Sequence, residues 1–216
     1  MNLLFDLDGT LMDSRPGILA CIRYALEQAG TVPPNDKELQ RCIGAPLNLS
    51  FAQWLAVEVD APCVAKAVAA YRERFTARGM FENAVFDQIP ATLDQVASCG
   101  GRLYVATSKP RIYAERILEH FELADRFIAV FGSELDGSLC DKSDLLQHAI
   151  RSAGLDPAAT VMIGDREYDM LGAVRNHVYP AGVLWGYGSD EELRRAGAKR
   201  LLSAPAEIPE LLTRAV

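Results

Sequence analysis

The residues best suited to chemistry lie near the start of the chain, in the string Asp6-Leu7-Asp8-Gly9-Thr10. An apolar run at residues 3–5 precedes it directly and predicts a short buried strand. Two carboxylates one residue apart at the end of such a strand need a reason, because buried charge is costly. An ordinary strand-to-turn junction would account for one Asp and one Gly, but it has no need of two acids, a glycine and a hydroxyl in one string. A metal and phosphoryl-transfer site at the carboxyl end of a parallel strand explains the whole string.

Three further groups of polar residues follow predicted strands or open predicted helices. Thr107 and Ser108 end the second strand, where a hydroxyl and backbone N–H groups can hold a phosphate oxygen or cap the next helix. Lys142 opens a helix, and taken alone it is typical of a solvated surface charge. Asp165 and Asp169 follow the fourth strand, where they suit either a ligand site or a helix N-terminus that favours acids.

The elements that must position these residues are predicted from hydrophobic periodicity. Strands are expected at residues 3–5, 103–106, 127–131, 160–163 and 178–184. Helices are expected at 16–29, 36–42, 47–57, 62–78, 89–96, 112–120 and 144–153, with a solvated surface helix in the charged stretch 191–200. Strands that alternate with helices predict an α/β fold with a parallel, doubly wound sheet.

About sixty residues of predicted helix separate the first strand from the rest of the sheet, which is much longer than a usual crossover connection. This length predicts a small, separate helical domain inserted into the α/β core. We expect the core domain to comprise residues 1–14 and 82–216 and the helical domain residues 15–81. Hinges between them are expected at residues 14–17 and 79–85.

Composition excludes several classes of function. The chain has 216 residues, of which 50% are hydrophobic, and this is enough to bury one core with a smaller appended domain. Its net charge of -7 and its lack of basic runs argue against nucleic-acid and membrane partners and favour a small soluble one. The five cysteines are scattered and include no Cys-x-x-Cys pair, which predicts neither disulfides nor zinc and fits a cytoplasmic location. No signal segment or membrane-spanning stretch is predicted. The sequence gives no prediction of the oligomeric state.

Together these motifs resemble the four motifs of the haloacid dehalogenase (HAD) superfamily phosphatases, in the same order and at the same strand ends. The matching residues are Asp6, Asp8, Gly9, Thr10, Thr107, Lys142, Gly164, Asp165 and Asp169. The resemblance covers the whole chain, and the helical insert is similar to the family's cap that follows the first strand. Phe5 to Ser14 and Thr107-Ser108-Lys109-Pro110 look most similar to phosphoglycolate phosphatase-like and nucleotidase-like members.

This resemblance implies a Mg²⁺-dependent phosphatase that works through an aspartyl-phosphate. A phosphorylated carboxylate is a reactive mixed anhydride, so Asp6 is assigned as the nucleophile and Asp8 as the acid and later the base. The remaining acids and a phosphate of roughly two negative charges exceed what Lys142 can balance, so a divalent cation is required, and oxygen ligands favour magnesium. The resemblance implies that Asp6, the Asp8 carbonyl and Asp165 hold the ion, with Asp169 in support.

Substrate contacts follow from the same resemblance. Thr107, the Ser108 N–H and Lys142 are expected to hold the transferring oxygens. The loop at residues 41–46 is expected either to reach the substrate or to be a plain turn between helices. If the substrate is phosphoglycolate, Arg41 is the first choice to bind its carboxylate, with Arg72 and Arg78 as reserves. The alternative is that each is a solvated arginine on a helix face. A nucleoside monophosphate is the other substrate expected.

Other activities remain open at this point. Asp8 argues against a haloacid dehalogenase, which lacks the second acid. A phosphonatase needs a cap lysine for a Schiff base, and Lys37 and Lys66 lie outside the candidate loop. A phosphosugar mutase or pyrophosphatase of the same superfamily, or a binding module that keeps the fold without chemistry, are the alternatives.

Overall fold

The computed structural model describes residues 1–40, 43 and 46–213. The chain forms two compact units, Met1–Asp13 with Val85–Val216 and Ser14–Ala84. Two short strands, β2 (Met12–Asp13) and β3 (Ala84–Val85), pair where the chain passes from one unit to the other and back. The sequence pattern did not predict this ribbon, since two-residue strands carry no periodicity.

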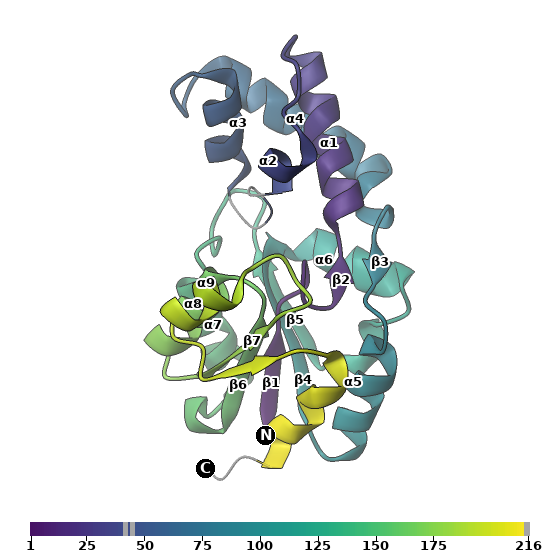
Figure 1. Ribbon diagram of the computed structural model, residues 1–216, viewed down its shortest axis with the longest axis vertical. Helices are drawn as coiled ribbons and strands as arrows, with labels where there is room; N and C mark the ends of the chain where they lie inside the picture. The colour runs from purple at the N-terminus through teal and green to yellow at the C-terminus, as the bar shows by residue number, and fades with distance from the viewer. Residues whose placement is uncertain (41–42, 44–45, 214–216) are drawn as a thin grey trace. The chain divides into compact units, whose positions relative to one another are not determined.

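The larger unit is built on a six-stranded sheet whose paired strands are all parallel. In sheet order its strands are β5 (Ala129–Ser133), β4 (Arg102–Pro110), β1 (Asn2–Phe5), β6 (Thr160–Gly164), β7 (Tyr179–Val183) and β8 (Arg200–Leu202). Figure 1 shows β1 in the middle of the sheet, with β4 and β6 on either side. From β1 the chain adds β4 and then β5 on one side, and it then crosses back to add β6 on the other side of β1. This reversal makes the carboxyl end of β1 the switch point of the sheet.

Side chains alternate across the sheet and form a core on each face. Leu4 lies in register with Tyr104 and Met162, and all three pack in one cluster with residues of α7 (Lys142–Ala153) and α8 (Glu167–Arg175). The opposite face is covered by α5 (Ile89–Ser98), α6 (Arg111–His120) and the 3₁₀ segment η4 (Pro205–Thr213) (Figure 1). Helices on both faces of a parallel sheet confirm the predicted doubly wound α/β fold.

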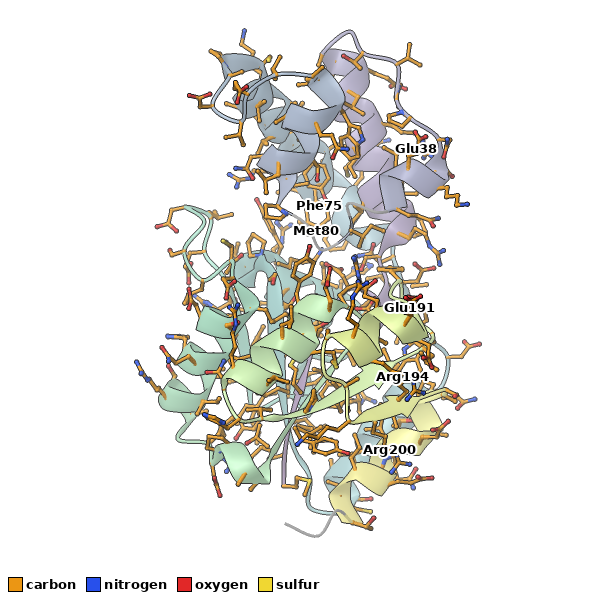
Figure 2. The ribbon with its side chains drawn as sticks, turned by 60° about the vertical axis from the view of Figure 1, so that its left-hand side comes forward. Glu38, Phe75, Met80, Glu191, Arg194 and Arg200 are labelled. Carbon is orange, nitrogen blue, oxygen red and sulfur yellow. The ribbon has the colours of Figure 1, made fainter. Side chains whose placement is uncertain are left out.

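The five predicted strands correspond to β1, β4, β5, β6 and β7, but the sixth strand was missed. Residues 191–200 were expected to form one surface helix, whereas α9 covers only Asp190–Arg195 and Arg200 opens β8. Gly197, with φ +101, ends the helical stretch and allows the chain to turn into the strand. Figure 2 marks Glu191 and Arg194 on the helix, where both are exposed, and Arg200 on the strand.

The second unit consists of α1 (Arg15–Gln28), α2 (Asp36–Gln40), α3 (Leu47–Leu55) and α4 (Pro62–Ala77), followed by the short η1 (Gly79–Phe81). Its interior contains Tyr71, which contacts Phe51 edge-on and stacks on Phe75. Phe75 and Met80 are both buried in this unit (Figure 2). Ser14 stands at the N-cap position of α1, but its side chain makes no capping hydrogen bond.

Two further observations concern membrane-spanning helices and disulfide bonds. Among the described residues, no helix combines the length and the hydropathy that crossing a bilayer requires. None of the four cysteines within the described residues forms a disulfide; they are Cys21, Cys63, Cys99 and Cys140.

Candidate active site

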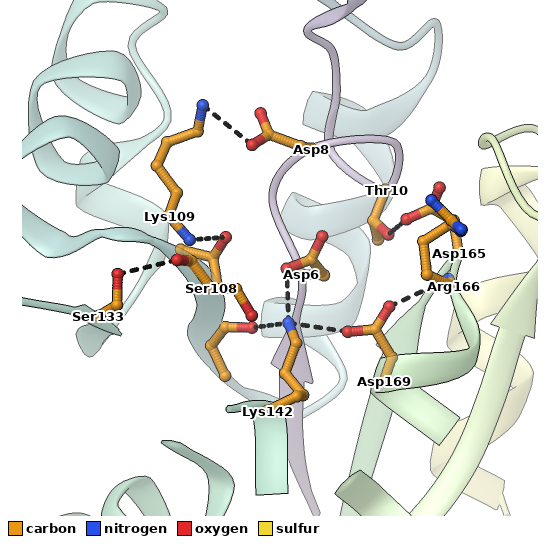
Figure 3. A network of polar contacts seen from close by, with 12 residues as sticks. Asp6, Asp8, Thr10, Ser108, Lys109, Ser133, Lys142, Asp165, Arg166 and Asp169 are labelled. Atoms are coloured by element: carbon orange, nitrogen blue, oxygen red, sulfur yellow. Dashed lines mark hydrogen bonds and ion pairs between the residues drawn. The ribbon is translucent and has the colours of Figure 1, made fainter. Parts of the chain in front are cut away.

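Three buried acids meet at the carboxyl edge of the sheet. Asp6 follows β1, Asp165 follows β6, and Asp169 lies in the first turn of α8. Their carboxylates each offer an oxygen within 4.8 Å of the others, the one such group of metal-ligating type among the described residues. The backbone N–H of Asp6 donates to the Ile163 carbonyl at 2.9 Å, which continues the β1–β6 ladder into the site. Adjacent parallel strands therefore bring together acids from opposite ends of the sequence (Figure 3).

Lys142 provides the positive charge at the centre of this cluster. Its Nζ lies 2.7 Å from Asp6 Oδ1, 2.8 Å from Asp169 Oδ1 and 2.9 Å from the Ala106 carbonyl oxygen (Figure 3). The side chain is only 5% exposed, so the reading of Lys142 as a solvated surface charge is wrong. As predicted, it opens a helix, α7, because the Asp141 carboxylate accepts from the N–H groups of Ser143 and Asp144 and caps the helix there.

Burial makes this acid cluster unfavourable in its fully ionised form. Burial raises the pKa of Asp6 to about 6; Lys142 acts to lower it, and Asp169 and Asp8 add to the rise. Burial, together with Asp169 and Asp6, also raises the pKa of Asp165 well above its ordinary value. For Lys142, burial acts to lower the pKa, but Asp169 and Asp6 outweigh it and keep the ammonium charged.

The loop after β1 is tightly wound around Gly9. The N–H groups of Thr10, Leu11 and Met12 all point to the Leu7 carbonyl, and the Gly9 N–H donates to the Met12 carbonyl at 2.8 Å. Gly9 has φ +86, and a Cβ at this position would lie 2.2 Å from Asp165 Oδ2. Glycine is therefore needed both for the backbone conformation and for the close approach of the two acid loops.

Asp8, the second acid of the string, has a separate cationic partner. Lys109 Nζ lies 2.9 Å from Asp8 Oδ2, with the two side chains 7% and 16% exposed (Figure 3). Sequence reasoning assigned no role to Lys109. The available signal was its position directly after Thr107-Ser108 at a strand end, where a lysine side chain can turn back over the sheet edge.

Thr107 and Ser108 lie where β4 becomes irregular. Strand β4 continues to Pro110, beyond its predicted end, and its register with β5 shifts between Thr107 and Pro110. The buried Thr107 hydroxyl accepts from the Lys109 N–H at 3.3 Å and does not cap α6, whose N-cap is Pro110. The Ser108 carbonyl accepts from the Ser133 hydroxyl at 2.8 Å, which holds this bend against β5 (Figure 3).

A segment after β7 also contacts the site and was missed by the sequence analysis. The Tyr187 N–H donates to Asp165 Oδ2 at 2.8 Å, and Trp185 Nε1 donates to the Thr10 carbonyl at 3.0 Å. The available signal was the string Trp185-Gly186-Tyr187-Gly188 directly after a predicted strand. Arg41, the residue expected to bind a substrate carboxylate, lies outside the described residues.

The comparison with protein families agrees with this geometry. Residues 3–183 match the family model described as haloacid dehalogenase-like hydrolase. The chain belongs to the haloacid dehalogenase-like hydrolase family. The predicted resemblance and the predicted enzyme class, a HAD-type phosphatase, are thereby confirmed.

Relatives of this HAD hydrolase carry several different names. The 5'-nucleotidase of Pseudomonas aeruginosa is 46% identical over 193 residues, which cover 89% of this chain and 86% of that protein. The tyrosine-protein kinase PtkA of Mycobacterium tuberculosis is 37% identical over 187 residues, covering 86% of this chain and 62% of that protein. The phosphoglycolate phosphatase of Neisseria meningitidis is 30% identical over 214 residues, which cover 96% of this chain and 90% of that protein.

Among solved structures, a crystal structure described as a predicted phosphatase from Clostridium acetobutylicum has a TM-score of 0.91 to this HAD hydrolase. The two are 40% identical, and the match covers 98% of this chain and 97% of that one. The fold of the chain is therefore that of the HAD family.

The raised pKa of Asp6 predicts how the stability of the ion-free protein depends on pH. An acid whose pKa is raised on folding stabilises the folded state at a pH below the pKa that it has in the unfolded chain, here 3.8. This stabilisation is lost as the pH rises through the folded-state pKa of about 6. Wild type should therefore lose stability relative to Asp6→Asn by on the order of 3 kcal/mol across this range. Urea unfolding in EDTA, measured at several pH values, checks the difference.

The matched control is Asp125→Asn, which changes an exposed acid of the same unit. Its stability difference from wild type should stay nearly flat with pH. A flat difference for Asp6→Asn as well would contradict the burial argument.

Proposed function

We propose that this HAD hydrolase is a magnesium-dependent phosphatase that hydrolyses a small phosphate monoester in two steps, with the phosphoryl group carried by Asp6 between them. The observation that supports this most directly is the buried cluster of Asp6, Asp165 and Asp169 around Lys142 at the switch point of the sheet. A structural ion-pair network would not need a surplus of buried acids, and perturbed carboxylates in such a place are typical of functional sites.

The chemistry of the donor set fits a hard divalent cation. Asp6, the backbone carbonyl of Asp8 and Asp165 would hold Mg²⁺, and Asp169 would support it through Lys142 and the Arg166 N–H, which donates to Asp169 Oδ2 at 3.1 Å. The acids and a phosphate together carry more negative charge than Lys142 can neutralise. When bound, the ion would supply that charge balance and favour the ionised form of the acids.

The protein's own residues then carry out the transfer. In the first step an Asp6 oxygen attacks phosphorus, the bond to the leaving oxygen breaks, and Asp8 donates the proton that this oxygen needs. The Thr107 hydroxyl, the Ser108 N–H and the Lys142 ammonium donate to the transferring oxygens as charge spreads over them. In the second step Asp8 takes a proton from water, water attacks phosphorus, and the bond to Asp6 breaks to release phosphate.

The substrate is a nucleoside monophosphate or a phosphoglycolate-like monoester. The relative named 5'-nucleotidase, at 46% identity, favours the first, and the one named phosphoglycolate phosphatase, at 30%, supports the second. A screen of the purified enzyme over nucleoside monophosphates, phosphoglycolate, sugar phosphates and pyrophosphate tests both and separates hydrolysis from mutase activity. Absence of both phosphate release and sugar-phosphate isomerisation, with Mg²⁺ present, would argue for a non-catalytic role.

The helical unit is assigned the role of the cap. The chain passes between the units at Asp13–Ser14 and Ala84–Val85, and we place the hinges of the cap near these points, at residues 14–17 and 79–85. A cap would exclude water while Asp6 is phosphorylated and admit it afterwards. Its residues would choose the leaving group, because the core contacts described here address only the phosphate.

Replacing the nucleophile should abolish turnover without unfolding the protein. Asp6→Asn is expected to lower kcat by at least about 10³-fold, as for the loss of a covalent nucleophile. Asp8→Asn should also be severely impaired but can still form the phosphorylated Asp6, which intact-mass spectrometry after rapid quenching detects. Near-normal turnover by a folded Asp6→Asn variant would rule out this mechanism.

Lys109 should matter most when the leaving group needs a proton. If Lys109 holds Asp8 in place, Lys109→Met should lower kcat/KM for alkyl phosphates by at least about 10-fold, part of what a general acid contributes. Turnover of p-nitrophenyl phosphate should change much less, because its leaving group is stable as an anion. Lys109→Arg, which keeps a cation near Asp8, should recover part of the loss. Equal losses on both substrates would assign Lys109 a general structural role.

Turnover should depend absolutely on a divalent ion. EDTA is expected to remove activity and Mg²⁺ to restore it, while Ca²⁺ should inhibit because its looser coordination misplaces Asp6 for attack. Initial rates at fixed substrate over a range of each ion provide the measurement. Undiminished turnover in excess EDTA would contradict the metal assignment.

A further inference from the structure

Few groups contact the Asp165 carboxylate, and they either belong to the segment just after β7 or are hydrogen-bonded to it. It is completely buried, its Oδ2 accepts from the Tyr187 N–H at 2.8 Å, and its Oδ1 is 3.5 Å from the Thr10 hydroxyl. Thr10 is itself tied to the same segment, because its carbonyl accepts from Trp185 Nε1 at 3.0 Å. Both contacts that orient this carboxylate therefore depend on residues just after β7.

Close backbone packing adds a second restraint on Asp165. A Cβ on Gly186 would lie 2.3 Å from Asp165 Cβ and 2.5 Å from the Gly9 carbonyl oxygen. A Cβ on Gly188 would lie 2.0 Å from the Asp165 carbonyl oxygen. Real Cβ atoms do not approach other atoms so closely, so this segment fills the space against both acid loops and leaves Asp165 no room to shift toward it.

The far end of the segment restrains the two residues that follow Asp165. Glu192 Oε1 accepts from Arg166 Nε at 2.8 Å and from the Glu167 N–H at 3.0 Å. The ion pair is partly buried, with side-chain exposures of 18% and 19%, so it is screened less than a surface pair. Contacts at both ends of residues 185–192 thus converge on the loop that carries Asp165.

We propose that residues 185–192 form a positioning brace that sets the orientation of Asp165 as a metal ligand. The inference rests on the proposed function, since it assigns a purpose to contacts around a proposed ligand. Groups that orient a ligating carboxylate contribute strongly to metal affinity although they do not touch the metal. A segment that served only the fold would contribute to stability and leave metal affinity unchanged. The effect of substitutions on metal affinity therefore distinguishes a positioning role from a purely structural one.

The principal test is Gly186→Ala. Apparent affinity for Mg²⁺ is read from the ion's effect on the melting temperature and, independently, from its half-saturating concentration in turnover of p-nitrophenyl phosphate. The substitution should weaken Mg²⁺ binding by about 10-fold or more, the range found for residues that orient ligands. Gly182→Ala is the matched control, because its added Cβ meets only the Leu201 and Leu193 side chains. It should lower the melting temperature and leave Mg²⁺ affinity unchanged.

Milder variants keep the test decisive if Gly186→Ala does not fold. Trp185→Phe removes the donor to the Thr10 carbonyl and should weaken Mg²⁺ binding by about fivefold, the scale of one hydrogen bond. Tyr187→Phe keeps the backbone N–H that contacts Asp165 and removes only the hydroxyl, which donates to Asp13 at 3.0 Å, so it should bind Mg²⁺ as wild type does.

The outcomes separate the brace from the function on which it rests. Folded Gly186→Ala and Trp185→Phe variants with wild-type Mg²⁺ affinity would overturn the brace and leave the phosphatase assignment intact. If only Trp185→Phe folds, its affinity alone decides. A wild-type protein whose melting temperature and turnover ignore Mg²⁺ would overturn both proposals.

Discussion

Much of this structure depends on one electrostatic constraint, the concentration of buried carboxylates around a single buried ammonium. Lys142 meets Asp6 and Asp169 at 2.7 and 2.8 Å, and no other side chain within the described residues forms an ion pair with these two acids. Buried charges are tolerated only when they are paired with good geometry. The start of α7 must therefore be held firmly, and the Asp141 cap and the packing of α7 against α8 and β4 hold it there.

The sheet topology makes this convergence possible. Because β1 lies between β4 and β6, the carboxyl ends of three neighbouring strands deliver Asp6, Thr107 and Asp165 to one edge. Hydrogen-bonded parallel strands stand only about 4.8 Å apart, so these groups meet without any long side chain reaching across. This spacing keeps Asp6 and Asp165 close, and the charges of Asp169 and Asp6 add to burial in raising the pKa of Asp165.

Much of the site was predictable from the sequence because three of its four motifs follow an apolar run, and the end of a buried strand is a local signal. Asp6, Thr107 and Asp165 were placed this way, as was the doubly wound sheet. Lys109 and residues 185–192 were not, since their importance comes from contacts with residues far away in the sequence. Strand β8 was missed because three residues carry too little pattern to predict a strand, and only their pairing with β7 defines it. The extension of β4 to Pro110 likewise depends on its pairing with β5.

The two acids of the first motif, to which we assign two different chemical roles, have different surroundings. A nucleophile has to be ionised when it attacks, whereas an acid has to hold a proton that it can give away. Asp6 and Asp8 differ by two positions, yet Asp6 is paired with Lys142 from α7 and Asp8 with Lys109 from β4. Asp6 also shares its surroundings with Asp165 and Asp169, while Asp8 projects from the loop that Gly9 winds tightly. The two carboxyls that we propose as nucleophile and acid therefore take their cationic partners from different elements, Asp6 from α7 and Asp8 from β4.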